Sequence, residues 1–507
     1  MELPSDTPDD VVAAAAGGPR VPQFDPTVGI PVIPPGGDAP HRLVVIGDSL
    51  SQGFQSGAIF NTDLSFPAII AHQLGWLDQF RFPRYGGPGG LPLNIELLLR
   101  TLEERFGPRL DLWEVPLALF AARAFMDEVE DYWERGPGSE APTFSAINHN
   151  LSVYGWDLRD ALTKTAQGCE AALHEPHDDL ISQIVENNGE RAALRVLPRG
   201  SEAEKRMTAF DAAAELGKEG IETLIVFLGA NNALRTVTEL RVEWSGNNFR
   251  DPDGKRDYTV WQPVHFASEY AEVLAAIRKI KAQHVILCTV PHVTIAPIAH
   301  GLGGKIEIGS RYFPYYARPW VRDTDFDPQR DQHITGAQAW AVDTAIDMYN
   351  DGIEQAVANA RRVGKDWYLC DIAGLLERVA SRRYVTDVNA RPSWWTPYPL
   401  PKALTDLQPV PDSLFLSADG RGGRASGGLF SLDGVHPTTV AYGVMAHELA
   451  NIMVTAGAQF DRAQVDFDRL VRRDTLVRTP PQNLDSTLGV IGWADEHLGF
   501  AKRVFGL

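Results

Sequence analysis

The sequence predicts an α/β fold with a doubly wound, five-stranded parallel sheet, and two kinds of pattern indicate it. Short apolar segments that read as buried strands stand at 43–46, 148–154, 221–228, 284–290 and 367–371. Apolar residues at three- and four-residue steps predict helices at 266–281, 337–362 and 439–454. Strands that alternate with helices are typical of a parallel sheet covered on both faces. Right-handed crossovers then bring the strand-end loops to one rim of the sheet.

The first of these strands runs directly into a candidate nucleophile. Its four apolar residues are followed by Gly47, Asp48, Ser49 and Leu50. Glycine permits a sharp turn, and aspartate and serine are common in turns and helix caps. A serine at the carboxyl end of a strand stands where open α/β sheets bind their ligands. The segment fits equally well a serine that only caps the next helix.

A base for that serine is available near the other end of the chain. Asp433 and His436 are three residues apart, so they fall on one side of a helical turn. The carboxylate can then accept from one imidazole nitrogen while the other nitrogen faces Ser49. A second Asp-x-x-His pair, Asp38 and His41, precedes the first strand and is expected at the wrong end of the sheet, on the surface.

Two further strand ends can supply donors for an oxyanion. Gly155 ends the second predicted strand, where its N–H is open to a substrate oxygen, and Asn231 follows the third strand. Glycine and asparagine are also ordinary turn residues, so a purely structural role remains open for both.

Together these four blocks resemble the GDSL or SGNH hydrolase superfamily, a family of serine esterases and lipases. The matching residues are 47–50, Gly155, 229–232 and 433–436. The resemblance implies the SGNH hydrolase fold, a flavodoxin-like, doubly wound, five-stranded parallel sheet, here with large and mostly helical insertions. One residue departs from the family pattern: Asn232 stands where aspartate is usual, and we expect it to shape the turn.

The resemblance also implies a set of site residues and a reaction. Ser49 is the implied nucleophile, His436 the general base and Asp433 its orienting carboxylate. The N–H groups of Ser49 and Gly155 and the side chain of Asn231 form the implied oxyanion hole. The implied activity is hydrolysis of a small-molecule, lipid or carbohydrate ester through an acyl-enzyme, with no cofactor and no metal. The alternatives are an acyltransferase and a non-catalytic binding protein of the same fold.

An α/β-hydrolase is disfavoured by the local sequence. That fold places its serine in a Gly-x-Ser-x-Gly elbow, and Ser51 stands where the second glycine would be.

Composition narrows the class of protein. The 507 residues are 44% hydrophobic and 22% charged, as in soluble globular proteins. A net charge of −19 argues against binding to nucleic acid. No apolar run approaches the roughly 18 residues of a membrane helix, and no signal peptide is visible, so we expect a cytoplasmic protein without stable membrane insertion. The three cysteines, Cys169, Cys288 and Cys370, are expected to be reduced core residues.

The predicted organisation has three parts. A Pro/Gly-rich arm at 1–41, expected to be extended or partly disordered, precedes the hydrolase domain at 42–456 and a C-terminal extension at 457–507. Cap-like insertions are expected at about 76–145, 170–210, 235–262, 298–335 and 381–429. The first carries helical patterns at 95–106 and 117–133, which either cover the site or only add core.

Two other groups of residues have a functional and a structural interpretation. The aromatic segments 311–320 and 394–399 can wall a pocket, but we favour loop packing. His174 and His177 suggest a metal, but no matching ligand cluster appears and a solvated loop is favoured.

Overall fold

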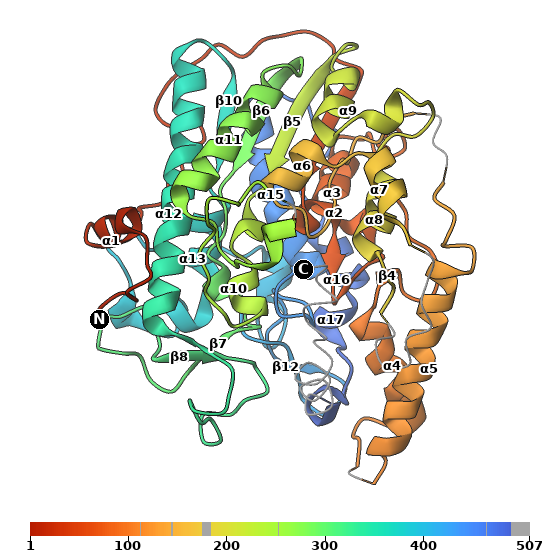
Figure 1. Cartoon of the computed structure of the whole chain (residues 1–507), viewed down its shortest axis with the longest axis vertical. Coiled ribbons are helices and arrows are strands. Elements are labelled where there is room, and N and C mark those ends of the chain that lie inside the picture. Colours follow the sequence, from red (N-terminus) through yellow and green to blue (C-terminus); the bar gives the residue numbers. More distant parts are fainter. Residues whose placement is uncertain (112, 143–145, 175–183, 252, 463, 488–507) are drawn as a thin grey trace.

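The centre of the protein is a parallel sheet of four strands. The computed structural model describes residues 1–111, 113–142, 146–174, 184–251, 253–462 and 464–487. The strand order is β1-β5-β6-β10 (Figure 1), with bounds β1 (His41–Gly47), β5 (Ile221–Phe227), β6 (Ala282–Cys288) and β10 (Trp367–Cys370). Four of the five predicted strands are therefore confirmed, each within a few residues of its expected bounds.

The remaining predicted strand, 148–154, lies along the other side of β1 without forming a regular strand. The N–H of Val45 donates to the carbonyl of His149 at 2.8 Å, and the N–H of Leu151 donates to the carbonyl of Val45 at 2.8 Å. Val45 and Asn150 make a single isolated bridge. The Asn150 side chain donates to the carbonyl of Ser51 at 2.9 Å, so this polar segment bonds to the short helix α2 (Ser49–Gln52) as well as to β1. Five regular strands are not confirmed.

Alternating side chains of the sheet feed two separate apolar layers. In β1, Val44 and Ile46 belong to one buried cluster, whereas Leu43 and Val45 belong to the other. The first layer is completed by α9 (Ala209–Leu216), α11 (Pro263–Ile277) and α12 (Gly336–Arg362), and the second by α3 (Phe66–Gln73) and α15 (Thr439–Thr455) (Figure 1). The fold is thus a mixed α/β architecture with helices on both faces of the sheet.

The helices predicted from periodicity are confirmed. α11, α12 and α15 correspond to the patterns at 266–281, 337–362 and 439–454. In the first insertion, α4 (Ile95–Phe106) and α5 (Val115–Glu134) match the patterns at 95–106 and 117–133, and they pack together at one side of the molecule (Figure 1).

Short elements complete the described part of the chain. The short helices are α2 (Ser49–Gln52), α6 (Leu158–Thr163), α7 (Ala166–Ala172), α8 (Asn188–Val196), α10 (Arg235–Thr238), α13 (Ile372–Val379), α14 (Lys402–Thr405), α16 (Phe467–Arg473) and α17 (Thr475–Arg478). The small antiparallel sheets are β2 (Phe54–Gln55), β3 (Ala58–Ile59) and β4 (Leu91–Pro92); β7 (His300–Leu302), β8 (Tyr315–Ala317) and β9 (Ile334–Thr335); and β11 (Ser417–Ala418) with β12 (Arg424–Ser426). No helix in these described stretches combines the length and apolar character that a bilayer span requires.

The N-terminal arm differs from its expectation because it contains a packed helix. α1 (Asp9–Ala15) lies against α12 and buries Val11 completely. Farther along the arm, the guanidinium of Arg20 donates to Asp371 and to Glu354, each at 2.8 Å. Apolar burial and these charged hydrogen bonds tie the arm to the domain.

Asp38 and His41, which were both expected at the surface, differ in burial. Asp38 is exposed as expected, but His41 is buried, with its Nδ1 3.1 Å from Nε2 of His149. As the first residue of β1, His41 lies at the end opposite to Ser49, which agrees with the sequence argument, but its ring packs under the irregular segment beside β1.

All three cysteines are buried and form no disulfide bonds with one another, as expected.

Candidate active site

The turn between β1 and α2 presents Ser49 at the carboxyl rim of the sheet. A carboxylate oxygen of Asp48 accepts from the N–H of Leu50 at 3.0 Å and caps the short helix. A Cβ on Gly47 would lie 2.9 Å from the carbonyl oxygen of Phe227, so the turn leaves room only for glycine. Ser49 follows directly and is buried apart from 5% of its surface.

Asp433 and His436 contact each other directly, as the sequence predicts. Nδ1 of His436 donates to Oδ2 of Asp433 at 3.0 Å. The local structure is a turn and not the helical turn we expected, because Oδ1 of Asp433 accepts from the backbone N–H groups of Val435 and His436 at 2.9 and 2.8 Å. Gly434 adopts a φ of 67° within this turn, a conformation that favours glycine.

The electrostatics of this pair favour an ionised carboxylate. Burial raises the pKa of Asp433, but the charge of His436 and the hydrogen bonds it receives lower that pKa to below its usual range. A carboxylate only accepts hydrogen bonds, so the proton of the neutral imidazole is assigned to Nδ1. Nε2 of His436 is then the nitrogen that can accept a proton.

Contacts between the two ends of the chain hold this pair beside the nucleophile turn. The segment just after α2 donates from Ser56 N–H to Oγ of Ser431 at 2.8 Å and from Gly57 N–H to Oδ2 of Asp433 at 3.0 Å. The ring of Phe54 lies 4.5 Å from the ring of His436, between centroids. Residues 375 and 376 positions apart in the sequence are thereby joined at one rim.

The two predicted oxyanion residues also lie next to each other. Nδ2 of Asn231 donates to the carbonyl of Trp156 at 2.8 Å, one residue beyond Gly155. The N–H of Tyr154, one residue before it, donates to Oε1 of Gln52 on α2 at 2.7 Å. Gly155 has a φ of 73°, and within the described residues its N–H and that of Ser49 donate to no protein group.

Asn232 has contacts that agree with a role in shaping its turn. Its side-chain oxygen accepts from the N–H of Leu158 at 3.4 Å, and its backbone carbonyl accepts from the N–H of Trp261 at 2.9 Å. Both contacts connect the end of β5 to neighbouring loops.

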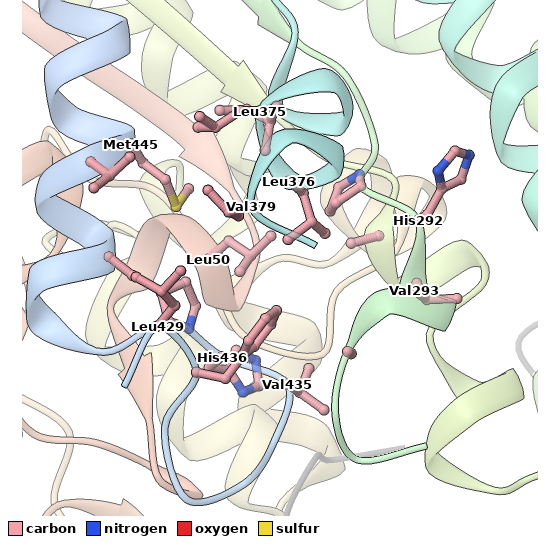
Figure 2. Close-up of a pocket in the computed structure, with 18 of the residues that line it drawn as sticks. Leu50, His292, Val293, Leu375, Leu376, Val379, Leu429, Val435, His436 and Met445 are labelled. Atoms are coloured by element: carbon pink, nitrogen blue, oxygen red, sulfur yellow. The ribbon is translucent and has the colours of Figure 1, made fainter. Parts of the chain in front are cut away.

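An apolar cavity opens beside the serine and the histidine. Its volume, counted as the space open to the centre of a water molecule, is about 120 Å³. Only three of its lining residues carry a polar side chain, namely Ser49, His436 and His292. Figure 2 shows Leu429 and Val435 beside His436, with Leu50 between them and Val379 and Met445; the described lining residues are Ser49, Leu50, Ala230, Leu234, Pro291, His292, Val293, Ala296, Ile372, Leu375, Leu376, Val379, Leu400, Leu429, Phe430, Val435, His436, Pro437, Ala441, Val444 and Met445.

Several expected residues do not line this cavity. Asp433, Gly155 and Asn231 stand outside its lining, and the first insertion contributes no wall to it. The aromatic segments are absent from it as well. Trp395 and Tyr398 are buried in their loop, as we favoured, whereas Phe313 and Tyr316 of the segment 311–320 line a second cavity.

His292 is a site residue that the sequence analysis missed. Its Nδ1 lies 2.7 Å from Glu377, and its Nε2 lies 3.0 Å from Asp347. Burial lowers the pKa of His292, but Asp343, Asp347 and Glu377 outweigh burial and raise it to about 10. The sequence could have pointed to His292 by its position just after β6, at the same rim of the sheet as Ser49. Its carboxylate partners lie in α12 and α13, far along the chain, so no local sequence pattern connects them to it.

Asp48 is a second buried acid at the site. Burial raises its pKa to about 7, against the effect of the Leu50 hydrogen bond and the charge of His436. Its other oxygen, Oδ2, is buried and has no hydrogen-bond partner within the described residues.

Neither a metal site nor a related protein is found for this chain within the residues that the structure describes and the proteins compared. Within the described residues no group of three His, Cys, Asp or Glu side chains could hold a metal ion. His174 is exposed, and His177 lies outside the described residues. Compared with known proteins, the chain matches no family model, no curated protein and no solved structure.

Proposed function

We propose that the protein is a serine ester hydrolase of the carboxylesterase or lipase type, with an SGNH hydrolase fold. The observation that carries the proposal is the Asp433–His436 hydrogen bond next to an apolar cavity that His436 shares with Ser49. The strand arrangement supports the fold: with the 149–153 segment beside β1, the spatial order is that of flavodoxin-like sheets.

The geometry supports a mechanism with an acyl-enzyme intermediate. Nε2 of His436 takes the hydroxyl proton of Ser49 as its oxygen attacks the ester carbonyl, and Asp433 stabilises the imidazolium that forms. His436 then donates that proton to the leaving alcohol. Water, deprotonated by His436, attacks the acyl-enzyme and releases the acid.

Three groups have N–H donors left for an oxyanion. The N–H groups of Ser49 and Gly155 have no protein acceptor among the described groups, and the Asn231 amide has a second N–H besides the one donated to Trp156. Removal of a single such donor typically lowers turnover by about 10²–10³-fold.

The lining of the cavity favours an ester with a hydrocarbon acyl group. A largely apolar wall next to the reactive serine gains free energy by removing hydrocarbon from water, at about 0.8 kcal/mol for each buried methylene. The proposal therefore names an aliphatic acyl chain and leaves the alcohol unspecified.

The direct test compares Ser49→Ala with Ser51→Ala in hydrolysis of p-nitrophenyl butanoate. Ser51 is a matched control, because it lies on the same short helix, is fully buried and has an Oγ without a hydrogen-bond partner among the described residues. We expect Ser49→Ala to lose at least about 10³-fold in kcat, because nucleophile and base act as a unit. Ser51→Ala should retain activity within a few-fold. Equal activity of the wild type and Ser49→Ala would refute the proposal, and product analysis with added alcohols distinguishes hydrolysis from acyl transfer.

A further inference from the structure

A second cavity lies behind one wall of the apolar pocket. Neighbouring residues of two segments alternate between them: Val293 and Val379 face the apolar pocket, whereas Thr294 and Ala380 face the second cavity. The volume of this second cavity, counted in the same way, is about 220 Å³.

The chemistry of the second cavity is cationic. Three arginines, Arg311, Arg382 and Arg383, line it together with the hydroxyl side chains of Ser381 and Ser413. Among the described residues that line it there is no aspartate or glutamate. The chain as a whole carries a net charge of −19, so a concentration of positive charge is unusual for this protein.

The three arginines differ in how far their charge is already neutralised. Arg383 is fully engaged, since it donates to Glu377 and to Asp343 at 2.8 Å each. Nε of Arg311 donates to the hydroxyl of Tyr312 at 2.9 Å, whereas its terminal nitrogens lie 3.6 Å from Glu377, 3.9 Å from Asp347 and 4.0 Å from Asp343, within ion-pair range but farther than a normal N–H···O hydrogen bond. The guanidinium of Arg311 therefore retains donors for another anion.

Arg382 has the least protein compensation. Its guanidinium carbon lies 4.8 Å from the centroid of the Phe313 ring, and among the described residues it forms no ion pair. Asp323 acts on it only as a more distant charge, and burial lowers the pKa of Arg382.

Lys305 adds to the positive field from the side of Phe313. Its Nζ donates to the backbone carbonyl of Arg311 at 3.0 Å and lies 4.6 Å from the Phe313 centroid. Burial, followed by repulsion from Arg383, lowers the pKa of Lys305 to about 8. Burial is the larger cause, and the repulsion shows that Lys305 and Arg383 lie close together.

The backbone that carries two of the arginines is itself uncommon. Residues Ser381–Val385 form a short π-helix, a conformation that is rare and frequent at functional sites. It directs Arg383 to the buried carboxylates and leaves Arg382 at the cavity.

We propose that the second cavity binds a phosphate group, held by the guanidinium groups of Arg382 and Arg311 with the serine hydroxyls nearby. The planar fork of arginine matches phosphate oxygens, and hydrogen bonds between ionised partners are about twice as strong as neutral ones. The phosphate is either free inorganic phosphate or part of an ester whose acyl chain occupies the neighbouring apolar pocket; only the second source rests on the proposed hydrolase function.

The test measures binding of inorganic phosphate by calorimetry and by the shift in Tm, against chloride at equal ionic strength. The variants are Arg382→Gln and, as a control, Arg322→Gln, whose side chain is 83% exposed and lies outside the cavity. We expect wild type and Arg322→Gln to bind phosphate equally, and Arg382→Gln to bind it at least about tenfold more weakly, with partial rescue by Arg382→Lys. Absence of phosphate binding by the wild type, or equal binding by both glutamine variants, overturns the proposal.

A second measurement identifies the source of the phosphate. The ratio kcat/KM is compared for a neutral butanoyl ester and a butanoyl ester with a phosphate in its alcohol part. If Arg382→Gln lowers kcat/KM for the phosphate ester but not for the neutral ester, the phosphate belongs to the substrate. If Arg382→Gln leaves kcat/KM for both esters unchanged but no longer binds inorganic phosphate, the cavity binds free phosphate. Phosphate binding is also measured with Ser49→Ala, so a failure of the hydrolase proposal leaves the binding result interpretable.

Discussion

Asp433 holds His436 by two contacts at once: Nδ1 of the imidazole donates to its Oδ2 at 3.0 Å, and the backbone N–H of the same histidine donates to its Oδ1 at 2.8 Å. The carboxylate thereby fixes both the ring and the turn that carries it. Gly57 N–H, from the segment that follows the nucleophile helix, binds Oδ2 as well. The orientation of the imidazole and one of the contacts between the two chain ends therefore depend on the same side chain.

Replacement of Asp433 by asparagine should remove catalysis without removing the turn. The amide oxygen can keep the backbone hydrogen bonds, but an amide N–H facing Nδ1 favours the tautomer with the proton on Nε2, which cannot act as base. We expect kcat to fall by about 10³–10⁴-fold with p-nitrophenyl butanoate. Asp38→Asn, in the exposed second Asp-x-x-His pair, is the control and should be unchanged. A loss of less than threefold in Asp433→Asn would contradict the assigned role.

We expect the apolar cavity to determine how kcat/KM depends on the length of the acyl chain. For chains that enter it, kcat/KM is expected to rise by up to about fourfold for each added methylene, which corresponds to about 0.8 kcal/mol. Val379→Phe fills part of this space and should lower the preference for longer chains while activity on the acetyl ester is kept. Val363→Phe, at a site that is 74% exposed, is the size-matched control. Identical chain-length profiles for the two variants would exclude this cavity as the acyl site.

Most of the architecture could be predicted because its signals are local. The β5 segment is a mostly apolar run between Gly220 and Gly229, and α12 shows helical periodicity over its whole length, so each was found near its observed bounds. The segment at 148–154 failed as a regular strand because its asparagine side chains bond to backbone carbonyls of α8 and α2, a tertiary effect that the apolar pattern of the sequence does not report.

The site shows the same division between local and long-range information. The turn that carries Ser49 and the Asp433–His436 pair are short motifs, so both could be picked out from the sequence alone. His292 was missed because its partners, Asp347 and Glu377, lie 55 and 85 residues away in the chain. His41 was wrongly placed at the surface because its burial depends on His149, which only the folded chain brings alongside.

The buried histidine pair should make stability fall in acid. Burial, followed by the charges of Arg81 and His41, lowers the pKa of His149 to about 2, whereas an unfolded histidine titrates near its ordinary value of 6.5. Below that value the unfolded chain binds a proton that the folded chain does not, so stability decreases as pH falls from about 6.5 toward 2, by up to about 1.4 kcal/mol per pH unit for one group.

The measurement is Tm between pH 7 and pH 4 for the wild type, His149→Gln and the partly exposed His447→Gln. We expect His149→Gln to have a lower Tm at pH 7 and a shallower decline in acid, while His447→Gln follows the wild type. An equally steep decline in His149→Gln would show that this pair is not the acid-sensitive element.

The central claim is that Ser49 is the nucleophile activated by His436, and covalent labelling with a fluorophosphonate tests it most directly. Mass spectrometry of the wild type and of Ser51→Ala should show a single adduct on Ser49; Ser49→Ala should show none, and His436→Asn should label at least about 10²-fold more slowly. An adduct on another residue, or labelling of Ser49→Ala at the wild-type rate, would contradict the account.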